Sequence, residues 1–226
     1  MKKFMVIAID GPAASGKSTT ARLLASRLGF TYLDTGAMYR SVTLAALEEG
    51  IDLKDEDAAA RVAEGVDIAF EGEPEDLKII MNGRDVTLDI RTPRVDASVS
   101  QVSSYKTVRA KMVALQRRLA QKGHMVAEGR DMGTVVFPDA DLKIFLVADI
   151  STRAVRRCRQ LEGFGLRTTV EEQLASLSSR DLFDSERANS PLKKASDAVE
   201  LDTSGMSINE QVQKAWDLAC ERLGIK

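Results

Sequence analysis

The chain has 226 residues, of which 44% are apolar and 29% charged. This is ordinary globular composition, and the length is enough for one large domain or one domain with an insertion. Lys and Arg number 32 against 34 Asp and Glu, a net charge of −2, which excludes the basic excess that general binding to nucleic acid or an anionic membrane requires. An anionic ligand therefore needs a local cluster of positive charge.

Cysteine and histidine are scarce. Cys158 and Cys220 are too few for a disulfide framework or a four-thiolate zinc site, which favours a reducing, cytoplasmic compartment. His124 is the single histidine, so histidine-rich metal sites are excluded and Ser-His-Asp chemistry would depend on that side chain. Met1-Lys2-Lys3 and the apolar run Phe4 to Ile9 are too short for a signal peptide, and no stretch reaches the roughly 18 apolar residues of a membrane span.

Two strand-and-helix units are expected at the amino-terminal end. Phe4 to Ile9 is uniformly apolar, as in a strand covered on both faces of a parallel sheet. A helix follows from Ser18 to Leu28, a short strand from Thr31 to Leu33, and another helix over residues 37–49. This alternation predicts an α/β fold.

Residues 66–96 have a different pattern of apolar residues from the rest of the chain. Short apolar runs there are separated by Gly and Pro, and Asn82-Gly83 joins two of them, which is a strong hairpin signal. The runs are Val66–Phe70, Leu77–Met81 and Arg84–Val86. We expect a small antiparallel insertion.

Regular elements return in the second half. Apolar residues at helical spacing are Val108, Met112, Leu115 and Leu119, and strands are expected at 125–127 and 142–148. Two late helices begin with capping boxes, at Thr169 with Glu172 and at Ser207 with Glu210. The last helix has a core-packing face made of Ile208, Val212, Trp216, Ala219 and Leu223.

Gly11 to Ser18 is a complete G-x-x-x-x-G-K-S phosphate-loop motif between a buried strand and a helix. Its backbone N–H groups and the helix N-terminus are expected to face phosphate oxygens, with Lys17 at the β- and γ-phosphates and Ser18 on Mg²⁺, whose other ligands would be water and phosphates. The expected ATP contacts are Gly11, Pro12, Ala13, Ala14, Ser15, Gly16, Lys17, Ser18 and Thr19. The competing interpretation is that this segment is a glycine-rich turn between a strand and a helix, in which Lys17-Ser18 occurs by chance.

The motif predicts a nucleoside triphosphate site but no particular reaction. A GTPase needs an Asn/Thr-Lys-x-Asp stretch to recognise guanine, and the sequence contains none. Asp202-Thr203-Ser204-Gly205 matches the D-x-x-G pattern of GTPase switches, but only two of its positions are fixed. We interpret it as a turn after a strand.

Four further segments point to an acceptor site. They are Leu33-Asp34-Thr35-Gly36-Ala37-Met38-Tyr39-Arg40, Ser100-Gln101-Val102, the segment Gly129 to Pro138, and Arg180-Asp181-x-x-Asp184-x-x-Arg187. Taken in order, they resemble the bacterial cytidylate kinases, P-loop kinases of nucleoside monophosphates, over nearly the whole chain. Ala14 stands where glycine is frequent in that family, and Thr35 where serine is.

The resemblance implies a three-layer α/β P-loop kinase fold with a central, mostly parallel sheet, a small antiparallel insertion and a helical lid. Residues 1–62 and 97–226 would form the core, with the lid at about 153–167, and residues 63–96 would bind the acceptor. The implied enzyme is a cytoplasmic monomer that transfers the γ-phosphoryl group of ATP, with Mg²⁺, to CMP or dCMP, without nucleic acid or membrane. The alternatives are a kinase for UMP or shikimate and a non-catalytic nucleotide switch.

The resemblance also assigns the CMP contacts. They are Thr35, Arg40, Ser100, Arg109, Arg130, Asp131, Asp184 and Arg187. Without the resemblance, the segment favours Thr35 as a helix N-cap and Arg40 as a solvated helix residue. Asp184 and Arg187 would hold the sugar and phosphate, although their spacing with Arg180 also suits surface ion pairs.

Ser100, Arg109 and Asp131 would recognise the base. An ionised Asp131 only accepts hydrogen bonds, which suits the amino group of cytosine, and Arg109 only donates, which suits the ring acceptors. Ser100 can do either. Without the resemblance, Asp131 is a turn residue and Arg109 a solvated neighbour of an apolar helix face.

Residues 151–167 carry a local charge of +4, from Glu162 and five arginines. The arginines are Arg153, Arg156, Arg157, Arg159 and Arg167. With flexible joints at Gly163-Phe164-Gly165, this segment resembles a lid that brings Arg153 and Arg157 to ATP; a solubilising helix face is the alternative. The expected catalytic residues are Lys17, Arg130, Arg157 and Arg180. Because the acceptor phosphate is already an anion, no general base is required.

Overall fold

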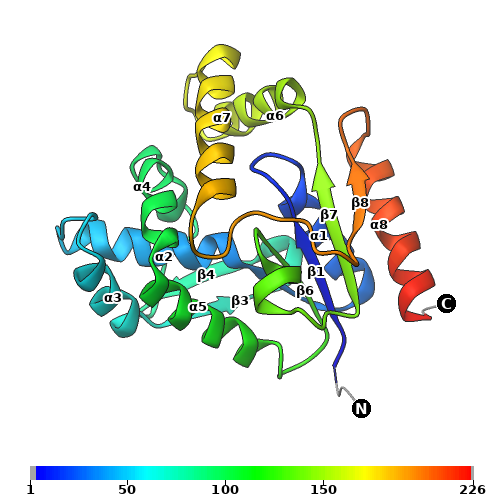
Figure 1. Ribbon diagram of the computed structural model, residues 1–226, viewed down its shortest axis with the longest axis horizontal. Coiled ribbons are helices and arrows are strands. Elements are labelled where there is room, and N and C mark those ends of the chain that lie inside the picture. Colours follow the sequence, from blue (N-terminus) through cyan, green and yellow to red (C-terminus); the bar gives the residue numbers. More distant parts are fainter. Residues whose placement is uncertain (1–3, 225–226) are drawn as a thin grey trace.

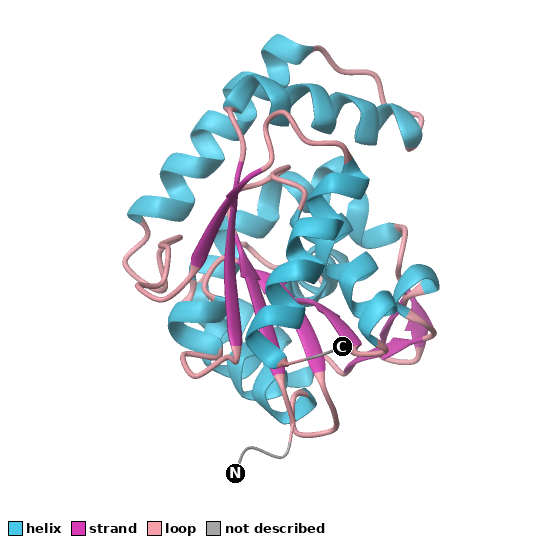
Figure 2. Cartoon of the chain, turned by 90° about the vertical axis from the view of Figure 1, so that its right-hand side faces the viewer, coloured by secondary structure: helices cyan, strands magenta, loops and turns pink. Residues whose placement is uncertain are grey.

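The computed structural model describes residues 4–224, in which a central sheet lies between layers of helices (Figure 1, Figure 2). The strands are β1 Val6–Asp10, β2 Thr31–Asp34, β3 Ile68–Glu71, β4 Lys78–Met81, β5 Arg84–Asp85, β6 Met125–Gly129, β7 Leu142–Val147 and β8 Val199–Asp202. The helices are α1 Lys17–Leu28, α2 Thr35–Glu48, α3 Glu56–Gly65, α4 Pro93–Ser104, α5 Lys106–Leu119, α6 Ile150–Gly163, α7 Val170–Glu186 and α8 Ile208–Leu223. Short 3₁₀ turns cover Pro74–Asp76 and Asp89–Arg91, and a π-helical turn covers Met132–Val136. Met1-Lys2-Lys3, considered above as the start of a signal peptide, lie outside the described residues.

The main sheet confirms the predicted parallel arrangement. Its strand order is β2-β6-β1-β7-β8, and every neighbouring pair is parallel. Asp10 at the end of β1 pairs with Gly129 of β6 and Phe145 of β7. The segments that follow the strands therefore gather at one edge of the sheet, where open α/β sheets bind ligands.

The apolar run in β1 is explained by cover on both faces. Ile7 and Ile9 are fully buried in one core with Leu24 of α1 and Ala215 of α8. Ala8 points to the other face, into a second core that includes residues of α2, α3, α4 and α5. A strand covered on both sides needs no alternation of polar and apolar residues.

The predicted antiparallel insertion is also confirmed. Strands β3, β4 and β5 form a separate sheet, and Asn82 and Gly83 turn the second strand into the third. Both turn residues have positive φ, 51° and 77°, as a two-residue hairpin loop of type I′ requires. The expected boundaries of the insertion at 63 and 96 fall inside α3 and α4.

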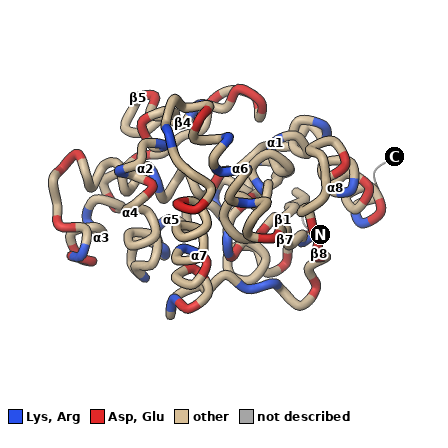
Figure 3. Tube along the Cα trace, turned by 90° about the horizontal axis from the view of Figure 1, so that it is seen from above, with Lys and Arg blue, Asp and Glu red and all other residues tan. Residues whose placement is uncertain are grey.

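Helices α6 and α7, residues 150–186, form an arm at the carboxyl ends of the strands (Figure 1). The connection turns through Gly165, whose φ is 74°, and the predicted capping box of Thr169 and Glu172 starts α7. Seen from above, basic segments of α6 lie next to acidic and basic segments of α7 (Figure 3). The arm therefore brings charges of both signs to the ligand-binding edge.

The prediction that Ile208 packs in the core is wrong. Ile208 is 56% exposed, because it is the first residue of α8 and the buried face of that helix begins three residues later with Gln211 and Val212. The capping box of Ser207 and Glu210 is present as predicted. Within residues 4–224, no helix has the length and apolar composition to cross a membrane.

Candidate active site

A cavity of about 620 Å³ opens at the carboxyl edge of the main sheet. Its wall combines the phosphate loop, the residues after β2 and β6, helix α4, the α6–α7 arm and the start of α8. The expected site residues on this wall are Ala13, Ala14, Gly16, Lys17, Ser18, Thr19, Thr35, Arg40, Arg109, Arg130, Asp131, Arg157, Arg180, Asp184 and Arg187. Those that lie off it are Gly11, Pro12, Ser15, Ser100 and Arg153.

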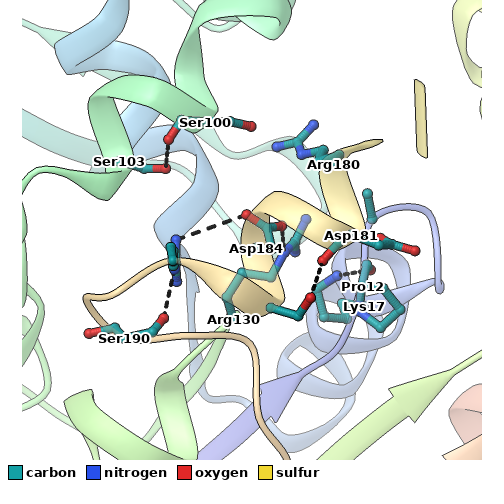
Figure 4. Close-up of polar contacts among 12 residues, drawn as sticks. Pro12, Lys17, Ser100, Ser103, Arg130, Arg180, Asp181, Asp184 and Ser190 are labelled. Carbon is teal, nitrogen blue, oxygen red and sulfur yellow. Dashed lines mark hydrogen bonds and ion pairs between the residues drawn. The ribbon is translucent and has the colours of Figure 1, made fainter. Parts of the chain in front are cut away.

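The phosphate loop has the conformation that its motif predicts. A Cβ on Gly11 would lie 2.1 Å from the carbonyl oxygen of Leu146, so only glycine fits there. Ala14 also has positive φ, 59°, a conformation that glycine adopts without strain. The ammonium of Lys17 is buried and donates to the Pro12 carbonyl oxygen at 2.6 Å (Figure 4). Burial, and then the charge of Arg130, lowers the pKa of Lys17, so this group is poised to gain an anionic partner.

Two buried side chains that the sequence did not mark as site residues donate hydrogen bonds to the backbone of the phosphate loop. Gln211 of α8 donates from Nε2 to the carbonyl oxygen of Gly16 at 3.0 Å. The hydroxyl of Thr203 donates to the carbonyl oxygen of Ser15 at 3.0 Å. Asp202 ends β8 and Thr203 to Gly205 form the turn after it, as the sequence predicts, and Thr203 of this turn also supports the phosphate loop.

Arg153 and Arg157 have different partners, although both lie on α6. Arg153 is buried and donates to the carbonyl oxygens of Ala148 and Ala13 at 3.0 and 3.3 Å, and it pairs with Asp181 at 2.7 Å. Arg157 lines the cavity. The structure thus brings Arg157 to the ligand space and uses Arg153 to tie the arm to the phosphate loop.

Carboxylates surround the loop on the sheet side. Glu128 at the end of β6 is buried and accepts from the Tyr32 hydroxyl at 2.7 Å. It lines the cavity together with Asp34 and Ser18. Burial, followed by repulsion from Asp34, raises the pKa of Glu128. Two acidic side chains and a hydroxyl beside a phosphate loop form an oxygen-rich set of the kind that Mg²⁺ prefers.

Asp10 fixes the segment that follows β6. Its carboxylate accepts from the backbone N–H groups of Met132 and Gly133 at 2.8 and 2.7 Å. Burial raises the pKa of Asp10 to about 6, against the opposing effect of these two hydrogen bonds. These hydrogen bonds fix the backbone just after Arg130 and Asp131, two residues of the cavity wall.

Arg109 and Asp131 form a buried ion pair on the cavity wall, with side chains 6% and 2% exposed. Arg109 also donates to the carbonyl oxygen of Ser103 at 3.1 Å and lies 5.3 Å from the centre of the Tyr39 ring. Among the described residues, the Arg109 Nε–H has no hydrogen-bond partner. Ser103 lines the cavity, whereas Ser100 accepts a hydrogen bond from Ser103 through its carbonyl oxygen (Figure 4).

The expected face of α7 is formed. Arg180 and Asp184 of α7, together with Arg187, the C-cap residue after it, all line the cavity, and the Asp184 carboxylate accepts from Arg130 Nε at 2.8 Å (Figure 4). Burial alone would raise the pKa of Asp184, but the charge and hydrogen bond of Arg130 outweigh it and hold that pKa below its usual range. Asp184 thereby positions Arg130; its other oxygen lies 4.0 Å from Arg187, whose Nε donates to the Ser190 carbonyl oxygen at 2.7 Å.

Thr35 is not a helix cap. The cap of α2 is Asp34, which accepts from the Ala37 N–H at 2.9 Å. The Thr35 hydroxyl donates to the Glu128 carbonyl oxygen at 2.6 Å on the cavity wall. The competing interpretation of Thr35 as a cap is therefore wrong.

Asp96 of α4 is a further site residue that sequence reasoning missed. It pairs with Arg40 and Arg157 at 2.5 Å and with Arg180 at 3.3 Å. These three arginines come from α2, α6 and α7, and all four side chains line the cavity. No local sequence signal marks Asp96, because its partners lie 56, 61 and 84 positions away.

The parallel sheet, the phosphate loop after its central strand and the ring of arginines define a P-loop kinase. The structure of a gluconokinase from Sinorhizobium meliloti 1021 supports this fold, with a TM-score of 0.50 at 14% identity over 100% of this chain and 97% of that chain.

Sequence comparison identifies the family. The family model of cytidylate kinase matches residues 7–221. A cytidylate kinase of Carboxydothermus hydrogenoformans is 49% identical over 95% of this chain and 96% of its own length. Those of Bacillus cereus and Lactobacillus johnsonii are 47% and 45% identical, over 96% and 95% of this chain and 97% and 93% of their own lengths. The chain belongs to the cytidylate kinase family and is an enzyme of that kind.

Proposed function

We propose that the enzyme transfers the γ-phosphoryl group of ATP to CMP and dCMP, giving CDP and dCDP. The observation that carries this proposal is the lining of one cavity, which combines the phosphate loop, the buried Arg109–Asp131 pair and several arginines. The loop suits a nucleoside triphosphate, and the arginines suit the phosphates of two nucleotides. The names of the relatives support the choice of CMP.

The Arg109–Asp131 pair suits cytosine. The ionised carboxylate accepts from the 4-amino group, and the unpartnered Nε–H of Arg109 supplies a donor for a ring acceptor. Uracil presents the opposite pattern at that edge, so it would leave buried polar groups unpaired, which costs far more binding energy than a poor shape match does.

The chemistry needs charge neutralisation and alignment rather than a base. An oxygen of the CMP phosphate attacks the γ-phosphorus of ATP, a new P–O bond forms, and the bond to the β,γ-bridging oxygen breaks to release ADP. Lys17, Arg130, Arg157 and Arg180 would neutralise the phosphates as they approach in line. Closure of the α6–α7 arm, including residues 153–167, would exclude the water that otherwise hydrolyses ATP.

The oxygen donors beside the loop fit Mg²⁺. Glu128 and Asp34 repel one another in a buried setting, and a divalent cation held by Ser18 and these carboxylates, through water and phosphates, would relieve that repulsion. When bound, it would offset the charge of the transferring phosphates.

The proposal extends to a monomer that acts in the cytoplasm on small nucleotides, without nucleic acid or membrane. A cavity assembled from a single chain supports the monomer, and the free thiols of Cys158 and Cys220 support a reducing compartment. Residues 63–96 would serve the acceptor, supported by Ile90, Arg91 and Asp96 on the cavity wall.

An acceptor panel tests the proposal. ADP release is measured with Mg-ATP and each of CMP, dCMP, UMP, AMP and shikimate, and without acceptor. We expect CMP and dCMP to stimulate turnover far above the rate without acceptor. Slow turnover that CMP does not change would instead indicate a nucleotide switch, and preference for another acceptor would overturn the substrate assignment.

A further inference from the structure

Asp96 lies where the phosphates of a bound nucleotide are expected. Its Oδ1 accepts from Arg40 at 2.5 Å and from Arg180 at 3.3 Å, and its Oδ2 accepts from Arg157 at 2.5 Å. Charged donors from three directions around two oxygens are the arrangement that holds a phosphate group. The Asp96 carboxylate thus accepts hydrogen bonds from arginines that, in the proposed function, bind the phosphates of the substrates.

The carboxylate keeps its charge in this setting. Asp96 is only 26% exposed, and burial alone would raise its pKa. The charges of Arg40, Arg157 and Arg180 outweigh burial and hold that pKa below its usual range. Asp96 is therefore an anion throughout the neutral pH range, facing the cations of the phosphate site.

We propose that Asp96 is an internal counterion, which occupies the arginine cluster in the empty enzyme and is displaced from it by the phosphate of the acceptor. This inference rests on the proposed function for the identity of the acceptor. Displacement makes Asp96 a residue that sets nucleotide affinity: it stabilises the arginines while the cavity is empty and competes with phosphate for them.

The same contacts link two parts of the fold. Asp96 belongs to α4 on the acceptor side, whereas Arg157 and Arg180 belong to the α6–α7 arm (Figure 1). The ion pairs with Arg157 and Arg180 therefore hold the arm to α4 when no nucleotide does so. Among the described residues, the Arg180 Nε–H has no hydrogen-bond partner, which leaves that side chain a donor for an incoming oxygen.

A permanent aligning role makes the opposite prediction. If Asp96 stayed in contact and oriented the arginines for substrate, its removal would weaken nucleotide binding. If it competes with phosphate, its removal makes the site more positive and strengthens binding. The direction of the change in affinity therefore separates the two roles.

The test compares Asp96→Asn with the control Asp217→Asn. Asp217 is an exposed residue of α8 that accepts a hydrogen bond from Gln213 at 2.7 Å and does not line the cavity, so it matches the charge change without touching the cluster. Calorimetry measures binding of CMP, inorganic phosphate and cytidine, and thermal melting measures the empty proteins.

For Asp96→Asn we expect CMP and inorganic phosphate to bind about tenfold more tightly, a change of the order produced by one charge near a protein surface. Cytidine has no phosphate, so its affinity is expected to stay the same. The empty variant is expected to melt at a lower temperature, because its arginines lose their counterion. The control should match the wild type in every measurement.

Asp96→Glu provides a second variant that keeps the charge, and it should show no gain in affinity for phosphate. Unchanged or weaker binding of CMP and phosphate to Asp96→Asn would overturn the proposal, as would an equal gain for cytidine. The phosphate titration tests Asp96 whether or not CMP is the acceptor, so this inference and the proposed function fail separately.

Discussion

Replacing Asp131 with Asn separates recognition of the base from stability of the fold. The change leaves the Arg109 guanidinium buried, at 6% exposure, without its ionic partner. Breaking a buried pair from one side costs about 3–5 kcal/mol, and we expect about 3 kcal/mol because the amide oxygen of Asn still accepts a hydrogen bond. For a chain of this length that lowers the melting temperature by about 6–12 °C.

The same variant tests discrimination between CMP and UMP. The Asn amide both donates and accepts, so it tolerates the carbonyl that uracil presents where cytosine has an amino group. We expect lower kcat/KM for CMP and a CMP to UMP ratio narrowed at least about tenfold, or roughly 1.4 kcal/mol.

Steady-state kinetics with both acceptors and thermal melting by circular dichroism measure the two effects. The double variant Arg109→Met/Asp131→Leu removes both charges, so it is expected to recover much of the melting temperature without recovering discrimination. An unchanged CMP to UMP ratio in Asp131→Asn would refute this reasoning, and so would a wild-type enzyme that uses UMP as well as CMP.

Three further predictions concern the phosphates. Lys17→Met is expected to keep the fold and reduce turnover by about 10²-fold or more; a residual rate above about a tenth would contradict this. Asp184→Ala and Arg187→Ala should lower kcat/KM for CMP far more than the affinity for ATP. If a titration shows that ATP affinity falls as much as kcat/KM for CMP, both residues belong to the ATP site or to the scaffold. Because burial lowers the pKa of Lys17 and ATP phosphates would raise it, ATP binding should take up protons and weaken as pH rises. Calorimetry in buffers of different ionisation heat measures this uptake, which Lys17→Met should abolish.

Local signals in the sequence determined the phosphate loop and several of the elements, although not α3 and α4. The loop depends on glycine where Gly11 allows no side chain, and the hairpin depends on positive φ at Asn82 and Gly83. These requirements on φ and on side-chain space depend on only a few neighbouring residues, so a short sequence motif is enough to predict them. The capping boxes at Thr169 and Ser207 are predictable for the same reason.

The candidate site was predictable where spacing along one element places side chains together. Arg180, Asp184 and the C-cap residue Arg187 line the same cavity because they recur at the period of a helix that ends at Glu186. Spacing failed for Arg153 and Arg157, which lie one turn apart on α6 but contact different parts of the protein. Periodicity specifies a face of a helix, but the partner of that face depends on packing.

Only the tertiary structure decided which charges meet and what supports the loop. Asp96 and Arg40 are 56 positions apart, and Gln211 reaches Gly16 across 195 positions. Neither Asp96 nor Gln211 differs, in its local sequence, from an ordinary polar residue on a helix surface. Their roles arise because the packing of helices α4 and α8 brings them to the carboxyl edge of the sheet, where burial makes the choice of partner decisive for stability.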